Sequence, residues 1–145
     1  MEGDIFDTVC ELGITLIPYS PLARGLVTAT VNDKEKLAQD DYRRTLPRFD
    51  DAHWQNNMEL VNDFAGFAVS KNCTPSQLAL AWVLAQGDNI IPISGTKHIK
   101  YLEENAGAVD ITLSENDLAS IEHIIAKHPN VGERYSEGAM KLVNH

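Results

Sequence analysis

Only two short stretches of this 145-residue chain have the pattern of buried strands, and they limit the possible fold more than any other feature. They are "ITLIP" at 14–18 and "NIIPI" at 89–93. The segments around them have helical spacing, and strands that alternate with helices favour a parallel sheet with right-handed crossovers. Two parallel strands leave unpaired edges and need cover on both faces. The pattern therefore predicts part of a larger α/β domain.

Helical spacing and helix-start signals locate the other elements. The sequence Thr74-Pro75-Ser76-Gln77 is a strong start, because the threonine caps, the proline fits the first helical position and the glutamine completes a capping box. Residues 27–52 are polar and irregular, which is typical of a long loop. We expect helices over about 5–12 (closed by Gly13), 54–68, 75–86, 98–106 and 114–125.

Charge and composition exclude several kinds of partner. The chain has 12 Lys and Arg against 21 Asp and Glu, a net charge of −9, so nucleic acid and anionic membrane are not expected to bind. It has no run of eighteen apolar residues and no signal-peptide pattern, and we expect a cytoplasmic protein. Cys10 and Cys73 are expected to be reduced, buried thiols. The scattered histidines predict no metal site.

The second strand run leads into a helix through Ser94-Gly95-Thr96-Lys97. Glycine permits close backbone approach, and we expect Thr96 to cap the helix that follows. Lys97 adds positive charge near a helix N-terminus, where the helix dipole already favours an anion. This junction predicts an anion site.

Several motifs, in order along almost the whole chain, resemble the C-terminal part of aldo-keto reductases. Members of that family fold as a (β/α)₈ TIM barrel of roughly twice this length. The resemblance implies that residues 1–145 form an incomplete domain, the cofactor-binding C-terminal part of such a barrel, with two parallel strands and about five or six helices. The motifs are "ELGITLIPYSPLARGL" (11–26), "LPRF" (46–49), "TPSQLALAWVLAQ" (74–86), "IPISGTK" (91–97), "LEEN" (102–105) and "GERY" (132–135).

The same resemblance implies that no catalytic residue lies in this chain. The catalytic tetrad of the family comes from the first four strands of the barrel, and none of those motifs is found here. None of the four tyrosines is assigned the role of the family's acid: Tyr19, Tyr42, Tyr101 and Tyr135.

What the chain does contain resembles the cofactor half of the family's site. The resemblance implies that Tyr19 stacks on a nicotinamide, although spacing alone favours a tyrosine packed at a barrel rim. It also implies that Ser20, Leu22 and Gly25 line the pyrophosphate and that Arg24 reaches a phosphate.

The junction after the second strand would then hold the adenosine end of NADP(H). The resemblance implies that Gly95, Thr96 and Lys97 hold the 2′-phosphate, with Lys100 as a second donor. Arginine stands at this place in many relatives, and lysine grips phosphate less well. Glu104 and Asn105 match the family's adenine contacts, whereas without the resemblance they would be a solvated helix face.

The expected function is therefore that of an NADPH-dependent aldo-keto reductase, an oxidoreductase that reduces aldehydes and ketones. This chain would bind the nicotinamide cofactor, and a carbonyl substrate would bind only in a complete barrel. We expect either a homo-oligomer or a separate N-terminal half to cover the open edges. The alternative is a catalytically inactive α/β module that self-associates or binds a partner.

Overall fold

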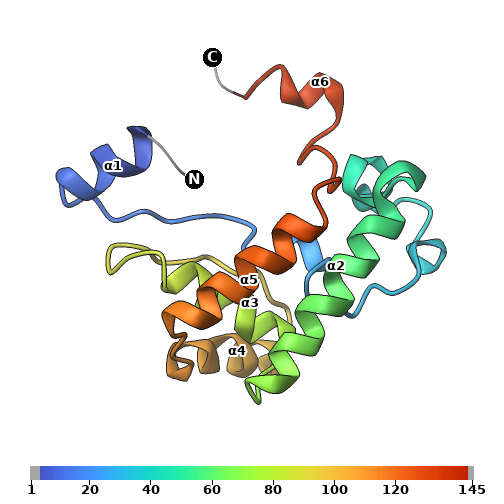
Figure 1. The fold of residues 1–145 in the computed structure, drawn as a ribbon. Coiled ribbons are helices and arrows are strands. Elements are labelled where there is room, and N and C mark those ends of the chain that lie inside the picture. Colours follow the sequence, from blue (N-terminus) through green and yellow to red (C-terminus); the bar gives the residue numbers. More distant parts are fainter. Residues whose placement is uncertain (1–3, 144–145) are drawn as a thin grey trace.

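A computed structural model describes residues 4–143 and is mostly helical (Figure 1). The six α-helices of this part of the chain are α1 Asp4–Glu11, α2 Asp51–Ser70, α3 Pro75–Leu84, α4 Ile99–Ala106, α5 Glu115–Lys127 and α6 Glu137–Met140. Five short 3₁₀ helices join them: η1 Ala23–Gly25, η2 Lys34–Lys36, η3 Tyr42–Thr45, η4 Pro47–Phe49 and η5 Gly107–Asp110. The helices expected from spacing are confirmed, with boundaries shifted by a few residues.

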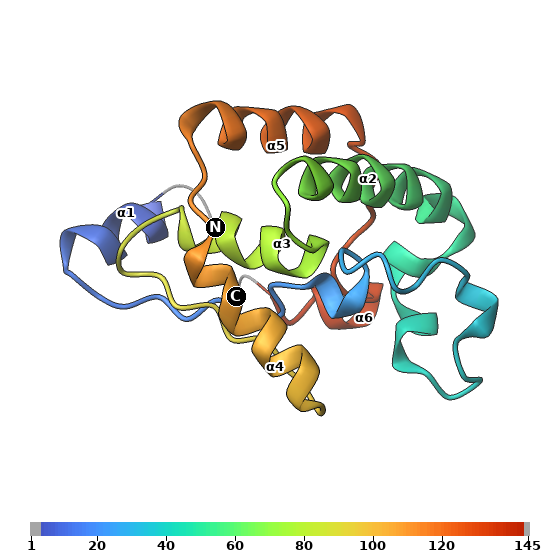
Figure 2. The same cartoon turned by 90° about the horizontal axis from the view of Figure 1, so that it is seen from below.

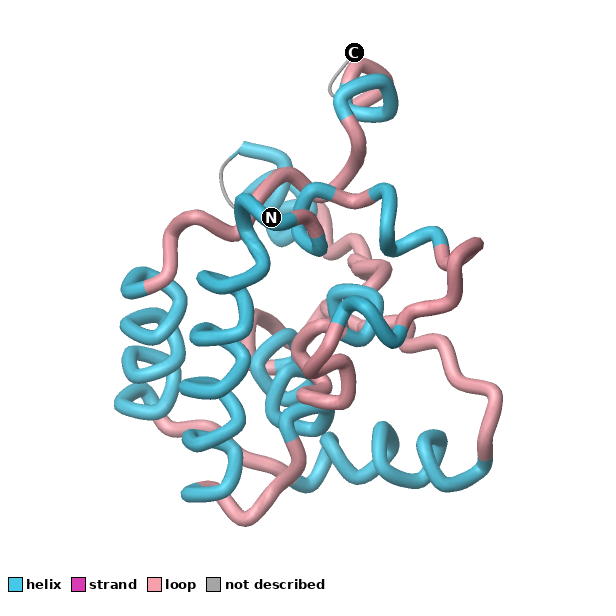
Figure 3. Tube along the Cα trace, turned by 90° about the vertical axis from the view of Figure 1, so that its right-hand side faces the viewer, coloured by secondary structure: helices cyan, strands magenta, loops and turns pink. Residues whose placement is uncertain are grey.

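The two strand-like runs lie side by side in parallel, but they make isolated bridges. Leu16 pairs with Ile90 and Tyr19 with Ile93. The Leu16 amide donates to the Asn89 carbonyl at 2.8 Å, and the Ile91 amide donates to the Leu16 carbonyl at 2.9 Å. Figure 3 draws no strand over residues 4–143, so the prediction of two continuous strands was wrong in extent. A proline inside each run removes an amide donor that a longer ladder would need.

The predicted capping box is confirmed at the start of α3, and α5 begins with a second one. At α3, the Thr74 hydroxyl accepts from the Gln77 amide at 3.2 Å and the Gln77 side chain accepts from the Thr74 amide at 3.1 Å. At α5, Ser114 and Asp117 form the same reciprocal arrangement. Each box satisfies amides that a helix start leaves without an intrahelical partner.

The main hydrophobic core lies where α2, α3 and α5 meet. Figure 2 shows α2 and α5 side by side, with α3 beneath them. The core consists of Phe64 and Ala68 from α2, Leu78 and Ala79 from α3, and Ile121 from α5. α3 buries residues around most of its surface, as its nearly continuous apolar sequence predicted.

A second cluster orders the long loop before α2. Leu26, Leu46 and Phe49 pack against Val61 of α2. Asn57 is fully buried, and its amide donates to the carbonyls of Arg48 at 2.8 Å and Val131 at 3.0 Å. This one side chain ties the loop and the segment after α5 to the same helix.

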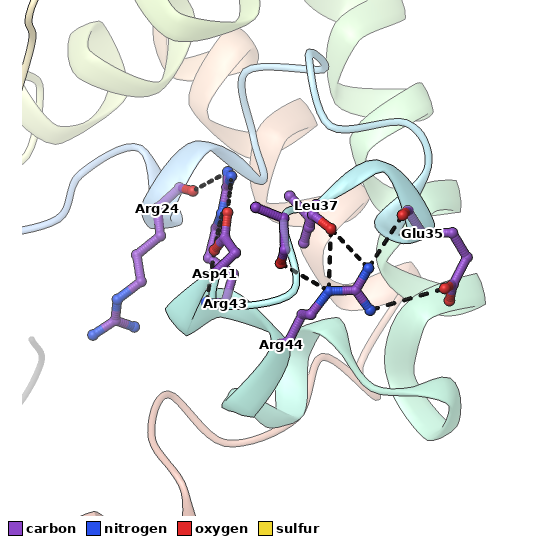
Figure 4. A network of polar contacts seen from close by, with 7 residues as sticks. Arg24, Glu35, Leu37, Asp41, Arg43 and Arg44 are labelled. Carbon is purple, nitrogen blue, oxygen red and sulfur yellow. Dashed lines mark hydrogen bonds and ion pairs between the residues drawn. The ribbon is translucent and has the colours of Figure 1, made fainter.

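Arg44 holds the loop from within. Figure 4 shows its guanidinium surrounded by backbone oxygens, with bonds to Leu37 at 2.8 Å, Ala38 at 3.1 Å and Glu35 at 3.1 Å. Residues 27–52 are therefore an ordered excursion with three short 3₁₀ helices, held largely by hydrogen bonds to the backbone.

α1 stands apart from the other helices and buries no residue (Figure 1). Gly13 ends it with a φ of +62°, as expected for a residue that closes a helix. The prediction that Cys10 is buried was wrong, because α1 packs on no core; Cys10 is exposed and Cys73 is only half-buried. None of the helices in residues 4–143 is both long and apolar enough to cross a membrane.

Candidate functional site

A cavity of about 570 Å³ lies between the turn after the first strand-like run, the start of α3, and α4. It brings together residues from four separate stretches of the chain. Seven of the eleven predicted site residues line it: Ser20, Leu22, Arg24, Gly25, Gly95, Glu104 and Asn105.

The turn that forms one wall has an unusual backbone. Ser20, Ala23, Arg24 and Gly25 all have positive φ, between +47° and +88°. Such angles are uncommon outside glycine, and where they cluster the surroundings must hold them in place. The Gly25 amide already donates to the Leu22 carbonyl at 2.8 Å, so this amide stabilises the turn.

The opposite wall is α4, whose position is fixed by a contact with α3. The Thr74 hydroxyl donates to the Glu104 carboxylate at 2.7 Å. Thr74 therefore caps α3 and orients Glu104 at the same time. Glu104 and Asn105 are half-buried in the cavity wall, which argues against a merely solvated helix face.

Gly95 lines the cavity where the second strand-like run ends. A Cβ built at this position would have no protein atom within 4 Å. The missing side chain therefore leaves open space at the edge of the cavity.

The other four predicted residues lie outside the lining of this cavity. Thr96, Lys97 and Lys100 are exposed, and Tyr19 lines a smaller neighbouring cavity. The prediction that Thr96 caps the next helix was wrong. The N-cap of α4 is His98, which makes no side-chain cap bond, and the Thr96 hydroxyl bonds the His98 carbonyl at 3.1 Å. Two residues separate Thr96 from α4, so its hydroxyl does not reach the amides of the first turn.

The smaller cavity has a volume of about 220 Å³. The residues that line it include Tyr19, Arg48, Arg134 and Tyr135. The hydroxyls of Tyr19 and Tyr135 are hydrogen-bonded. That bond lowers the pKa of Tyr19, and the positive charges of Arg134 and Arg24 lower it further. The same bond raises the pKa of Tyr135.

Sequence reasoning missed several residues of the larger cavity. The sequence predicts Thr74 as a helix cap and assigns no catalytic role to Tyr101. Their place in the wall follows from how α3 and α4 pack, which no local motif encodes. The missed residues are Pro21, Thr28, Thr30, Thr74, Pro75, Ser76, Ser94 and Tyr101.

The chain is similar to proteins of known family. The aldo/keto reductase family profile matches residues 2–126. An aldo-keto reductase of Schizosaccharomyces pombe, whose name specifies NADP(+), is 42% identical over 129 residues, which are 89% of this chain and 38% of that protein. An aldo-keto reductase of Strobilurus tenacellus is 39% identical over 139 residues, 95% of this chain and 41% of that protein.

A solved structure supports the fold. A glycerol dehydrogenase from Gluconobacter oxydans matches with a TM-score of 0.74 and 22% identity, over 86% of this chain and 38% of its own. The chain thus spans about two fifths of the length of the relatives it matches, and its arrangement is that of part of their TIM-barrel fold. On the extent of the profile match and the identity to these reductases, the chain belongs to the aldo/keto reductase family.

Proposed function

We propose that this chain is the cofactor-binding C-terminal part of an NADPH-dependent aldo-keto reductase. The observation that carries the proposal is the cavity of about 570 Å³, in which the turn at residues 20–25 and the α4 residues Glu104 and Asn105 face one space. A volume of this size suits a small-molecule cofactor site. The NADP(+) in the name of one relative agrees with this choice.

Each wall has a part to play in holding a dinucleotide. The turn at residues 20–25 lies beside the pyrophosphate, where Ser20 supplies a hydroxyl and Leu22 supplies packing. Glu104, oriented by Thr74, accepts a hydrogen bond from the adenine amino group, and Asn105 adds a second polar contact. Tyr19 gives a flat face against which a nicotinamide ring stacks. The nicotinamide supplies the hydride for carbonyl reduction.

The exposed residues beyond Gly95 form the phosphate end. Thr96 and Lys97 directly follow the cavity residue Gly95 in the sequence, and Lys100 directly precedes the cavity residue Tyr101. All three side chains are accessible to solvent. Lys97 precedes the N-terminus of α4 by two residues, so its ammonium and the helix dipole both favour the 2′-phosphate of NADP(H). Because the lysines are exposed and lack the fork of arginine, the preference for NADP over NAD is modest.

The carbonyl substrate binds when a complete barrel is assembled around this part. The two bridged runs expose Ile14, Ile17, Ile91 and Ile93. In a complete barrel, neighbouring strands cover such residues. The same surface supports the alternative that the chain is a catalytically inactive module that associates with itself or a partner.

Titration of NADP⁺ and NAD⁺ into the purified chain tests the proposal. We expect saturable binding with NADP⁺ preferred by roughly ten- to hundred-fold at most, the range of a charge-assisted phosphate contact. Lys97→Ala should weaken NADP⁺ binding and leave NAD⁺ binding nearly unchanged. Lys36→Ala is the matched control, because Lys36 is an exposed lysine of the loop before α2.

The outcomes separate the parts of the proposal. Equal loss of both cofactors in Lys97→Ala would show that Lys97 does not recognise the 2′-phosphate and would shift that role to Lys100 or Arg24. Absence of saturable binding for either cofactor would contradict the proposal for this chain.

A further inference from the structure

The smaller cavity gathers three arginines. Arg24 comes from the turn at residues 20–25, Arg48 from η4 and Arg134 from the segment after α5. Guanidinium groups brought together from three separate segments repel one another, so a folded chain keeps them together only where something offsets that repulsion. Arg48 belongs to the "LPRF" motif and Arg134 to the "GERY" motif. The proposed function gives neither motif a role in binding.

Within residues 4–143, carboxylates balance the charge of this cluster only in part. Of the ion pairs found in residues 4–143, none involves Arg24, Arg48 or Arg134. Arg24 instead donates to the Arg134 carbonyl at 3.1 Å, and Arg48 donates to the Gly132 carbonyl at 3.3 Å. Burial and the positive charges of Arg134 and Arg24 lower the pKa of Arg48, and the charge of Glu133 only partly opposes them. An anion in the cavity would relieve this imbalance.

Two of the three arginines, Arg24 and Arg48, are also held in place. The Arg24 guanidinium lies over the rings of Tyr135 and Tyr42, at 5.1 and 5.6 Å from their centroids. Figure 4 shows it pointing away from the Asp41–Arg43 pair, while the Arg24 carbonyl oxygen accepts from Arg43. Asn57 fixes the backbone that carries Arg48. Side chains fixed in this way lose little freedom when they bind a ligand.

The two cavities share a border at the end where Tyr19 lies. Ser20 and Arg24 line both of them, and Tyr19 lines the smaller one. If Tyr19 stacks on the nicotinamide, as the proposed function requires, the smaller cavity opens beside the reacting end of the cofactor. A cavity of about 220 Å³ holds a charged group and a few carbon atoms, but not a nucleotide.

We infer that the cavity between Arg24, Arg48 and Arg134 binds the carboxylate of the substrate, so that the enzyme acts on aldehydes or ketones that also carry a carboxylate. The inference rests on the proposed function for the carbonyl, but the oxyanion site itself is tested without the cofactor. Planar guanidinium forks match the planar carboxylate group and can donate two parallel hydrogen bonds to it.

The test follows the arginine Nε–Hε signals of the purified chain by NMR while a ligand is added. Butyrate is the carboxylate probe, butyramide is its neutral counterpart, and inorganic phosphate distinguishes a general oxyanion site from a carboxylate site. We expect butyrate to shift the signals of Arg48 and Arg134 in a saturable way, butyramide to leave them unchanged, and phosphate to bind more weakly.

Substitutions of single residues test whether butyrate binds in the smaller cavity. Arg134 is exposed, so Arg134→Gln should fold normally and weaken butyrate binding by about tenfold, with Arg134→Lys in between. Lys36→Gln makes the same charge change outside the cavity and should have no effect. Equal shifts with butyramide, tighter binding of phosphate, or unchanged affinity in Arg134→Gln would overturn the inference. If butyrate binds and NADP⁺ does not, the result would support the oxyanion site. It would contradict the proposed function, which requires cofactor binding.

Discussion

Gly95 is the residue at which the account of the larger cavity can be tested with least disturbance to the fold. Its backbone does not have a positive φ, and a Cβ added there would meet no atom of a non-neighbouring residue within 4 Å. We therefore expect Gly95→Leu to change the free energy of unfolding by less than about 0.5 kcal/mol. The same change should strongly weaken NADP⁺ binding, because the new side chain fills space meant for the ligand.

Urea unfolding and NADP⁺ titration of the same variant check both halves of this prediction. Gly138→Leu is the control, since Gly138 also has open space around it but lies in α6. Full NADP⁺ affinity in Gly95→Leu would show that the ligand does not approach this part of the backbone.

Asn57 matters for stability and for the position of Arg48. It is fully buried, and replacing it by alanine would leave the Arg48 and Val131 carbonyls without their donor. We expect Asn57→Ala to destabilise the fold by about 2 kcal/mol, within the range for unsatisfied buried groups. Urea unfolding measures the change in the free energy of unfolding. Asn62→Ala is the control, because Asn62 is an exposed residue of the same helix. A loss no larger than that of the control would mean that the loop is held by other contacts.

At the scale of elements, helix starts were the features that the sequence predicted best. The capping boxes at Thr74 and Ser114 depend on residues three apart, so their signal is entirely local. The extent of the strands was predicted poorly, because strand pairing depends on neighbours that are far away in sequence. The larger cavity was predicted in part, through the family resemblance. Its Thr74–Glu104 contact was missed because it arises from the packing of α3 against α4.

The junction of α2 and α5 predicts how stability changes with pH. The Lys71 ammonium, 2.8 Å from the carboxylate, and the Ser114 amide and hydroxyl lower the pKa of Asp117 from its ordinary 3.8 to about 2. A lowered pKa in the folded state means that the contribution is present above the unfolded value and is lost as the pH falls toward 2. We expect stability to decrease over this range, and the decrease to be smaller in Asp117→Asn.

Urea midpoints measured from pH 5 to pH 2 test this expectation. Glu115→Gln serves as the control, because Glu115 is an exposed acid of the same first turn. An identical pH dependence in Asp117→Asn and the original chain would contradict the assignment.

At the scale of the whole molecule, the two bridged runs and the segment around α1 expose apolar side chains. Besides the isoleucines of the two bridged runs, α1 exposes Ile5, and Leu12 follows it. Exposed apolar surface of this kind favours association. We therefore expect the purified chain to form dimers or larger assemblies, which light scattering with size-exclusion chromatography would detect. A monomer that unfolds in one sharp thermal transition would show that the fold is stable without a partner over its exposed apolar surface.

We also expect reductase activity to require a complete barrel. These residues contain no assigned general acid, a group whose contribution is typically about 10²- to 10⁴-fold. We expect the purified chain by itself not to oxidise NADPH in the presence of a simple aldehyde. Steady oxidation by material free of host reductases would contradict that expectation and would point to an acid among these residues.

The most direct test of the central claim is to map NADP⁺ onto the chain by backbone amide shifts. We expect saturable shifts concentrated at residues 19–30, 74–76, 94–97 and 101–105, with α5 and residues 31–52 largely unaffected. Shifts scattered over the surface, or saturable shifts away from the cavity of about 570 Å³, would contradict the claim that this cavity is the cofactor site.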